Sequence, residues 1–241
     1  MHDPRAEVER LEAVAAVYDP SNPEKEFDYH TKRLHLEVMR PFIRGDHLLE
    51  MGCATGELTS LLIDCAKRYD VVEGSSRNID ITKARVPKAR YFRALWEEFK
   101  PADHYSDVVV NCALEHVEDP VGTLVRAKGW LEPGGVVHVV VPNADSLHRL
   151  VGVEMGIIES RTTLSQSDVR IGHRRVYDLD HLLRDVRSAG LEPVHWQGIF
   201  LKVVSNQQML GWDPALIHAL HRVGQRFPSF CAELYIVARP A

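Results

Sequence analysis

The sequence of 241 residues lacks several features that would place it in a specialised class of protein. It contains no run of 18 apolar residues, so no membrane-spanning helix is expected, and its N-terminus has no apolar core of a signal peptide. Its four cysteines are widely separated and form no C-x-x-C pair, which argues against a disulfide or zinc framework. Basic residues are not in excess either, because the formal net charge is -5, and this disfavours nucleic acid as a partner. We therefore expect a cytoplasmic protein with no membrane or nucleic-acid partner.

Apolar residues make up 45% of the chain, which is enough for the core of one α/β domain. Their spacing predicts strands at 47–51, 71–73, 89–93, 105–111, 136–141, 193–200 and 233–237. Helices are predicted at 1–19, 27–42, 57–68, 77–86, 121–130, 146–158 and 177–189, with a break at 19–23 and a helical insertion at 206–227. Such alternation predicts an α/β fold with a doubly wound, mostly parallel sheet.

We expect the whole chain, residues 1–241, to form a single domain. Its predicted parts are N-terminal helices at 1–45, a core at 46–142, and insertions at 143–177 and 202–230. Long insertions at one edge of a scaffold are usually lids or substrate platforms. The apolar helices of 206–227 could form the roof of a pocket or the face of a homodimer.

The stretch Leu48–Leu62 combines an apolar strand, a Gly52-x-x-x-Gly56 turn and a helical pattern. Such a turn lets backbone N–H groups approach a ligand closely at the carboxyl edge of a parallel sheet. A dinucleotide fingerprint would place a third glycine at position 57, where this chain has Glu57. A carboxylate there would repel a pyrophosphate, which disfavours an NAD-dependent oxidoreductase.

A ligand without phosphates fits this pattern better. Glu50 begins the string Glu-x-Gly-x-Ala-x-Gly, and Glu73 follows 23 residues later at the end of the second predicted strand. A carboxylate at that position can accept hydrogen bonds from two ribose hydroxyls. Trp96 follows the third strand, and Asn111-Cys-Ala-Leu-Glu-His116 follows the fourth.

Together with Leu131-Glu-Pro-Gly-Gly135, these motifs resemble the class I S-adenosylmethionine-dependent methyltransferases in order and spacing from residue 48 to 142. The resemblance implies a Rossmann-like, seven-stranded sheet and S-adenosylmethionine as cofactor. It also implies that the cofactor is bound by Gly52, Cys53, Ala54, Gly56, Glu73, Gly74, Ser75, Leu95, Trp96, Asn111 and Cys112. Glu73 would hold the ribose with Gly74 and Ser75 beside it, and Leu95 and Trp96 would meet the adenine. The methionine end would be lined by Gly52, Cys53, Ala54 and Gly56, with Asn111 and Cys112 beneath it.

Three further residues have less certain places around the cofactor. Glu50 could contribute to the cofactor site or could only anchor the turn by accepting backbone N–H groups. In related small-molecule enzymes an arginine before the glycine turn holds the cofactor carboxylate, and Arg33 is the best placed candidate, with Tyr29 one helical turn before it. These two residues could equally form an ordinary helix face.

Methyl transfer to a hydroxyl usually needs a general base, and histidine suits neutral pH. His116 lies at the carboxyl end of the fourth predicted strand. His173 lies in the string Gly-His-x-x-x-Tyr, which resembles a subgroup of bacterial methyltransferases suspected of acting on sugars or secondary metabolites. We interpret both as candidate catalytic residues, with His148 and Asp145 as weaker candidates. No histidine pattern indicates a metal, and none is expected.

The sequence therefore predicts an S-adenosylmethionine-dependent methyltransferase whose acceptor is a small polar molecule, with transfer to a hydroxyl of a sugar or secondary metabolite. N-methylation of an amine or aminosugar is an alternative, and a non-catalytic scaffold that only binds the cofactor is another. DNA adenine methylation is disfavoured, because no Asn-Pro-Pro-Tyr type motif follows the fourth strand.

Overall fold

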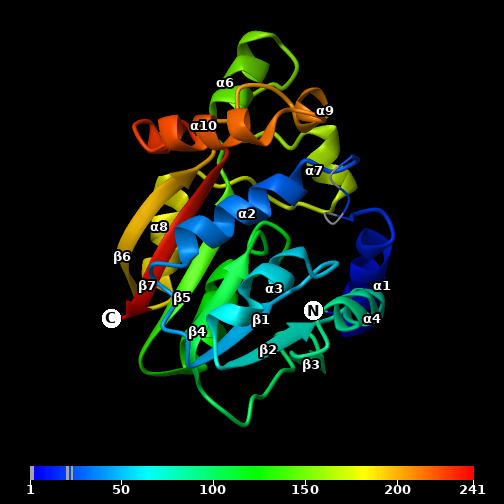
Figure 1. Cartoon of the computed structure of the whole chain (residues 1–241), viewed down its shortest axis with the longest axis vertical. Helices are drawn as coiled ribbons and strands as arrows, with labels where there is room; N and C mark the ends of the chain where they lie inside the picture. The colour runs from blue at the N-terminus through cyan, green and yellow to red at the C-terminus, as the bar shows by residue number, and fades with distance from the viewer. Residues whose placement is uncertain (1–2, 20–21, 23) are drawn as a thin grey trace.

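The protein is described by a computed structural model that covers residues 3–19, 22 and 24–241, and its centre is a seven-stranded sheet. The strand order is β3-β2-β1-β4-β5-β7-β6, and β7 runs antiparallel to both of its neighbours (Figure 1). The strands are β1 (His47–Met51), β2 (Arg68–Glu73), β3 (Arg90–Arg93), β4 (Tyr105–Asn111), β5 (Leu131–Pro142), β6 (Leu191–Ile199) and β7 (Glu233–Pro240). The predicted mostly parallel α/β sheet is confirmed.

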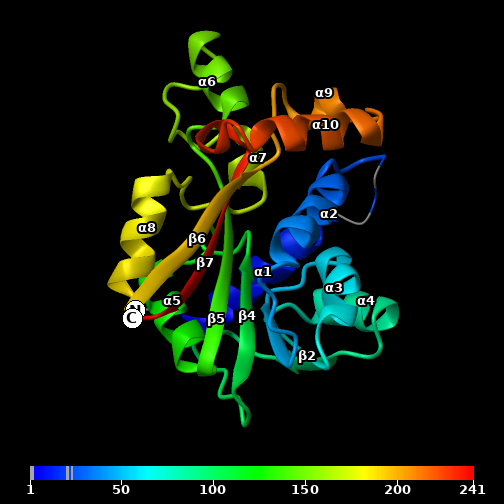
Figure 2. The same ribbon diagram turned by 60° about the vertical axis from the view of Figure 1, so that its left-hand side comes forward.

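Helices cover both faces of this sheet (Figure 2). They are α1 (Pro4–Ala15), α2 (Asp28–Met39), α3 (Glu57–Leu62), α4 (Ser76–Arg85), α5 (Pro120–Gly129), α6 (Leu147–Glu154), α7 (Gln166–Arg170), α8 (Leu179–Ser188), α9 (Asn206–Met209) and α10 (Pro214–Gly224). Two short 3-10 turns follow α3 and α10, at Ile63–Cys65 and Pro228–Phe230. The predicted break after the first helix includes residues 20, 21 and 23, which lie outside the described residues. Residues 1 and 2 of the predicted first helix also lie outside them.

Side-chain alternation along β1 divides the core into two layers. Leu49 and Met51 pack in the layer that includes α5 and α8, whereas Leu48 packs in the layer that includes α2 and α3. Successive side chains of a strand point to opposite faces, so a continuous apolar run supplies both layers. The central strands are thereby fixed, and the carboxyl ends of β1, β2 and β4 lie at a common edge of the sheet.

Several predicted boundaries differ from the structure, and two of them concern the quoted motifs. The helix after the glycine turn ends at Leu62 and not near Arg68, because Arg68 already pairs with His47 at the start of β2. Strand β5 begins five residues earlier than predicted, since Leu131 pairs with Tyr105. The Glu-Pro-Gly-Gly segment therefore belongs to an irregular start of the strand, where the register shifts, and not to a turn before it.

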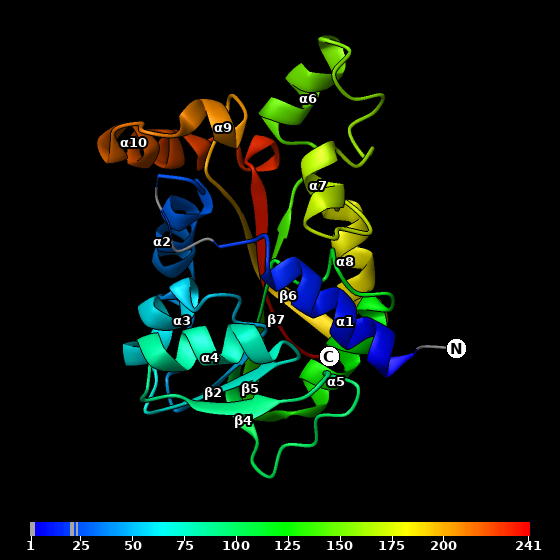
Figure 3. The same cartoon turned by 90° about the vertical axis from the view of Figure 1, so that its right-hand side faces the viewer.

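The insertions gather beyond one end of the sheet, where α6, α7, α9 and α10 lie together (Figures 1 and 3). Helix α7 was not predicted; a capping box formed by Ser165 and Asp168 begins it. Pro214 does not interrupt a helix but begins α10, where its missing N–H costs no hydrogen bond. Whether α10 forms a homodimer face stays a prediction. No helix in the described ranges is long and apolar enough to cross a membrane.

Candidate functional site

A cavity of about 1510 Å³ opens at the carboxyl edge of the parallel strands. Its walls come from the ends of β1, β2 and β4, from α1 and α2, and from the insertions around α6, α7 and α9. Pockets for one small ligand usually span about 300–1,000 Å³. This cavity therefore has room for two ligands side by side.

The turn after β1 approaches the cavity with an unusual backbone. Gly52 and Gly56 have φ angles of 82° and 80°, and Ala54 has a φ of 45° despite its side chain. A Cβ on Gly52 would lie 3.3 Å from Trp96 Cζ2, and one on Gly56 would lie 2.6 Å from a methyl carbon of Thr82. Positive φ at a non-glycine residue costs free energy and is concentrated at functional sites.

Glu73 ties this turn to the end of β2. Its carboxylate accepts hydrogen bonds from the backbone N–H groups of Cys53 and Ser75, at 3.2 and 2.8 Å. Burial raises the pKa of Glu73, although these N–H donors act in the opposite direction. The carboxylate lines the cavity, where it can still accept hydrogen bonds from a ligand.

Glu50 has different partners from those considered in the sequence. Its carboxylate accepts hydrogen bonds from the hydroxyls of Thr59 and Tyr69, at 2.7 and 2.9 Å. Burial raises the pKa of Glu50 to about 7 against the effect of these hydroxyls. The residue holds α3 and β2 to β1, and no backbone N–H of the turn is among its hydrogen-bond donors in the part of the chain described.

Helix α1 closes one side of the cavity and packs beside α4 (Figure 3). Leu11 of α1 lies over Gly74, where an added Cβ would come within 2.5 Å of it. Leu95 and Trp96 line the same region. Glu12 fixes the helix in place by accepting hydrogen bonds from Ser75 Oγ and from the backbone N–H of Ser76. This contribution of α1 to the cavity wall was not predicted.

Not every predicted binding residue reaches the cavity. Within the described residues, Tyr29, Arg33, Gly56 and Ser75 are absent from its lining. Arg33 stacks on the Tyr29 ring and donates to Glu57 Oε1 at 2.9 Å, and Arg85 donates to the other oxygen of Glu57 at 3.0 Å. The Glu57 charge is therefore balanced by two arginines, so its repulsion of a phosphate is weaker than the sequence suggested.

Lys32, the neighbour of Arg33, is the cation of α2 that lines the cavity. Its ammonium lies 3.6 Å from Cys112 Sγ, and the Cys112 thiol contacts Glu233 Oε1 at 3.6 Å. The other Glu233 oxygen accepts from His35 Nε2 at 2.7 Å. Burial opposes the Lys32 charge, but the Cys112 sulfur and, after it, the carboxylates of Glu233, Asp28 and Glu115 raise its pKa. Cys112 has a φ of 50°, so it is, like Ala54, a non-glycine residue with a strained backbone. Lys32, Glu233 and His35 surround it.

The two predicted catalytic histidines lie together although they are far apart in the sequence. The rings of His116 and His173 meet edge to face with centroids 4.7 Å apart. Burial, the charge of His173 and Arg10 lower the pKa of His116 to about 3, so its imidazole is neutral at pH 7. Burial also opposes the charge of His173, but Asp168, 3.3 Å from its Nδ1, and Glu115 raise its pKa.

Glu115 completes this group. Its side chain is fully buried, and neither carboxylate oxygen has a hydrogen-bond partner among the residues that the structure describes. Burial raises its pKa to about 7, against the attraction of His173. One ligating atom each from Glu115, His116 and His173 lies within 4.8 Å of the other two. Glu115 was not among the predicted site residues, although it directly precedes His116.

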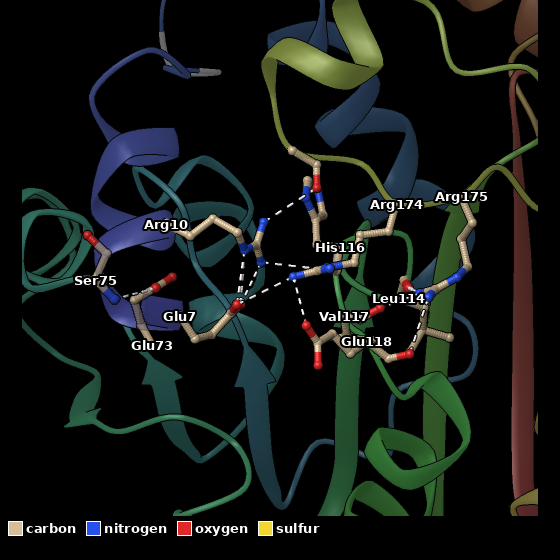
Figure 4. Close-up of polar contacts among 11 residues, drawn as sticks. Glu7, Arg10, Glu73, Ser75, Leu114, His116, Val117, Glu118, Arg174 and Arg175 are labelled. Carbon is tan, nitrogen blue, oxygen red and sulfur yellow. Dashed lines mark hydrogen bonds and ion pairs between the residues drawn. The ribbon is translucent and has the colours of Figure 1, made fainter. Parts of the chain in front are cut away.

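Arginines hold the loop that carries His116 (Figure 4). Arg10 of α1 donates to the carbonyl oxygens of His116 and Gly172, at 3.3 and 3.4 Å. Arg174 donates to the same His116 oxygen at 2.9 Å, and Arg175 donates to the carbonyl of Leu114 at 2.8 Å. These contacts fix the position of the His116 backbone. The weaker candidates lie nearby: His148 lines the cavity, while Asp145 pairs with Arg161.

Residues 16–196 match the family described as a methyltransferase domain. The ubiquinone biosynthesis O-methyltransferase of Cereibacter sphaeroides is 28% identical over 225 residues, covering 83% of this chain and 87% of that protein. The trans-aconitate 2-methyltransferase of an Enterobacter species is 30% identical over 119 residues, covering 45% of this chain and 46% of that protein.

Solved structures share the fold. The N-methyltransferase NodS from Bradyrhizobium japonicum, in complex with S-adenosyl-L-homocysteine, superimposes with a TM-score of 0.60. The match covers 99% of each chain at 16% sequence identity. At that identity the similarity shows a common architecture.

Proposed function

The chain belongs to the class I S-adenosylmethionine-dependent methyltransferases, and we propose that it transfers the methyl group to a hydroxyl of a small polar acceptor such as a sugar or secondary metabolite. The observation that carries this proposal is the pair of histidines on the wall of a cavity with room for two ligands. A relative named as an O-methyltransferase spans most of the chain and supports a hydroxyl acceptor.

We assign the cofactor to the end of the cavity formed by the glycine turn. Glu73 would accept hydrogen bonds from the ribose hydroxyls, and Leu95 with Trp96 would contact the adenine. The methionine end would lie along Gly52–Ala54 towards Asn111 and Cys112. Asn111 Oδ1 is buried and has no hydrogen-bond partner in the described ranges. Buried polar atoms normally have such a partner, and a bound ligand would supply it.

The partner of the cofactor carboxylate is a second assignment. Arg33 with Tyr29 was predicted from the sequence, and this prediction stays open although neither residue reaches the cavity in this structure. Lys32 is a competing candidate, because its ammonium is at the cavity wall beside Cys112.

S-adenosylmethionine, when bound, supplies an electrophilic methyl group on a sulfonium. The protein then has to align the acceptor oxygen with that methyl group, exclude water and remove the hydroxyl proton. We assign proton removal to His173, oriented by Asp168, or to His116, whose low pKa keeps it neutral. An imidazole oriented by a carboxylate is a suitable base near neutral pH.

A second function rests on a specific observation. The superimposed NodS structure is that of an N-methyltransferase, and an amine acceptor needs no base beyond its own neutral form. Under this alternative the histidines would only shape the acceptor site.

The test is a methyl-transfer assay with S-adenosylmethionine against a panel of sugars, aminosugars and phenols, read by mass spectrometry. Binding of S-adenosylhomocysteine by the same preparation is measured by calorimetry, with an expected Kd in the micromolar range or tighter. Methylation of a hydroxyl supports the proposal, and methylation confined to amines supports the alternative. A protein that binds the cofactor and methylates no acceptor would be the non-catalytic scaffold.

A further inference from the structure

We propose that Glu115, His116 and His173 bind one divalent transition-metal ion, of the class of zinc or manganese, beside the acceptor end of the cavity. The three residues each offer one ligand atom, and these atoms lie within 4.8 Å of one another. Two imidazoles and one carboxylate form a common protein ligand set that leaves further coordination positions open. All three residues line the cavity, so an open position would face the acceptor.

The first argument is the state of Glu115. A buried carboxylate normally has a charged or hydrogen-bonding partner, because desolvation without one costs several kcal/mol. Both oxygens of Glu115 are buried without such a hydrogen bond among the described residues, and the side chain is 0% exposed. A cation bound to Glu115 would remove this deficit.

The second argument is the way the two histidines are held. His173 Nδ1 faces Asp168 Oδ1 at 3.3 Å, and the His116 ring lies beside Gly172, with Nδ1 4.0 Å from where a Cβ on that glycine would be. Each imidazole thus lies against a second segment of the chain that orients it. Metal-binding histidines are usually oriented in this way, by a carboxylate or a backbone carbonyl on the second nitrogen.

Asp168 is itself held rigidly, which supports this orienting role. Its carboxylate accepts hydrogen bonds from the backbone and hydroxyl of Ser165, both at 2.8 Å, and from Arg149 at 3.1 Å. Interactions with Ser165 and His173 outweigh burial and keep the pKa of Asp168 low. Asp168 is therefore ionised, and its carboxylate lies next to the His173 ring.

The neighbouring cations do not occupy the site. Arg10 is paired with Glu7 at 2.6 Å, and Lys32 lies against Cys112. A second group, His35 with Cys112 and Glu233, also has its ligand atoms close together. That group is a poorer metal site, because the Lys32 ammonium already lies 3.6 Å from Cys112 Sγ and His35 already bonds to Glu233.

This inference rests on the proposed function and refines it. An acceptor hydroxyl bound to the cation would lose its proton to water more readily, because the metal stabilises the alkoxide. The oxygen would then form a bond to the methyl carbon while the carbon–sulfur bond breaks, and that electron pair would remain on sulfur. With the ion bound, this route would replace direct proton removal by His173 or His116, and both histidines would act on the acceptor through the ion.

The experiment uses the full chain, purified without a histidine tag and freed of metal with a chelator. Zinc ion alone is titrated by calorimetry, and Co²⁺ is titrated by visible absorption, which reports nitrogen and oxygen ligands. We expect one ion per chain, with affinity reduced at least about tenfold by Glu115→Gln and by His173→Ala. His218→Ala, which removes an exposed histidine, is the matched control and should leave the affinity unchanged.

Equal metal affinity in the wild type and in both site variants would overturn the inference, as would wild-type protein that takes up no ion. If Glu115→Gln does not fold, as judged by circular dichroism, His173→Ala decides the result alone. Binding of S-adenosylhomocysteine and methyl transfer are measured in parallel. Transfer that is unaffected by full chelation overturns the metal site and leaves the proposed function intact. Zinc binding by the expected ligands in a protein that binds no S-adenosylhomocysteine supports the site and refutes the proposed function.

Discussion

The two ends of the cavity differ in how their carboxylates are satisfied. At the glycine turn, Glu50 and Glu73 each accept two hydrogen bonds from the protein. Glu115, at the opposite end, is equally buried, yet neither of its oxygens accepts a hydrogen bond from the described residues. The carboxylates of the first end are therefore satisfied without a ligand, whereas the second end has a buried carboxylate that is not.

Apolar side chains show the same contrast. Leu95 and Leu58 at the cofactor end are buried, whereas Met155 and Ile157 on the acceptor side are 68% and 69% exposed. Both exposed residues belong to the cavity lining. Large exposed apolar side chains at a cavity usually mark a surface that a ligand or a moving segment covers. The contrast indicates a preformed donor site and an acceptor site that its ligand completes.

Replacing His173 by alanine should have the largest effect, and it should change turnover without changing cofactor affinity. We expect kcat to fall about 1,000-fold, roughly 4 kcal/mol, because the residue that activates the acceptor is lost. The affinity for S-adenosylhomocysteine, measured by calorimetry, should stay within about twofold. His218→Ala serves as the control. Full activity of His173→Ala would refute the catalytic assignment of this residue and would favour His116 or an amine acceptor.

The ionisation of Glu50, at the cofactor end, should make the free energy of unfolding depend on pH. Its pKa rises from 4.5 to about 7 on burial, so the folded state holds the proton more tightly than the unfolded chain. The resulting stability is present below about pH 4.5 and is lost as the pH rises through about 7, a change of about 3 kcal/mol. Urea unfolding of wild type and Glu50→Gln at pH 4.5, 6 and 8 measures the difference. A difference that does not vary with pH would contradict the expected titration.

Glu115→Gln should raise the free energy of unfolding of the metal-free protein by about 2 kcal/mol, because it removes a buried charge that has no hydrogen-bond partner. Glu73→Gln, the same change at the cofactor end, should lower it, since two backbone N–H groups would lose a carboxylate acceptor. Denaturant unfolding of both variants at pH 8 is the measurement. If Glu115→Gln and Glu73→Gln lowered the free energy of unfolding equally, the two carboxylates would not differ in the way described.

The smallest effects concern cofactor affinity. Glu73→Ala should weaken S-adenosylhomocysteine binding at least about tenfold, roughly 1.4 kcal/mol, through loss of the ribose contact. Arg33→Ala should cost only about threefold, because Arg33 acts through Glu57 and not at the cavity wall. A loss with Arg33→Ala that matches or exceeds that of Glu73→Ala would restore the direct contact predicted from the sequence.

Local patterns predicted the strands of the cofactor end but not all of its walls. Strand β4 has the predicted bounds, 105–111, because a run of valines buried on both faces leaves little choice of register. Glu73 lies at the end of β2 as predicted, since its position depends on the strand alone. Short-range spacing is the main signal in a sequence, so the strands and the turn were found, whereas the packing of α1 over Gly74 was not.

The acceptor end depends on contacts between distant segments, which spacing does not contain. His116 and His173 are separated by one strand and three helices, so their approach is a property of the tertiary fold. The choice between Lys32 and Arg33 depends on which side of α2 meets the sheet. Adjacent residues of a helix point about 100° apart, so the rotation of α2 about its axis decides which of the two reaches the cavity. Glu115 was overlooked because a pattern does not reveal a missing hydrogen bond.

The arginine contacts on the loop of His116 have a consequence for the order of events in turnover. Arg10 belongs to α1, which lies over Gly74 at the cofactor end, yet its guanidinium holds the backbone of His116 and Gly172 (Figure 4). Displacing α1 to exchange the cofactor would remove the Arg10 contacts with both histidine segments at once, while Arg174 and Arg175 would still hold the loop of His116. Steady-state kinetics should accordingly be sequential and ordered, with the donor binding first and its spent form leaving last.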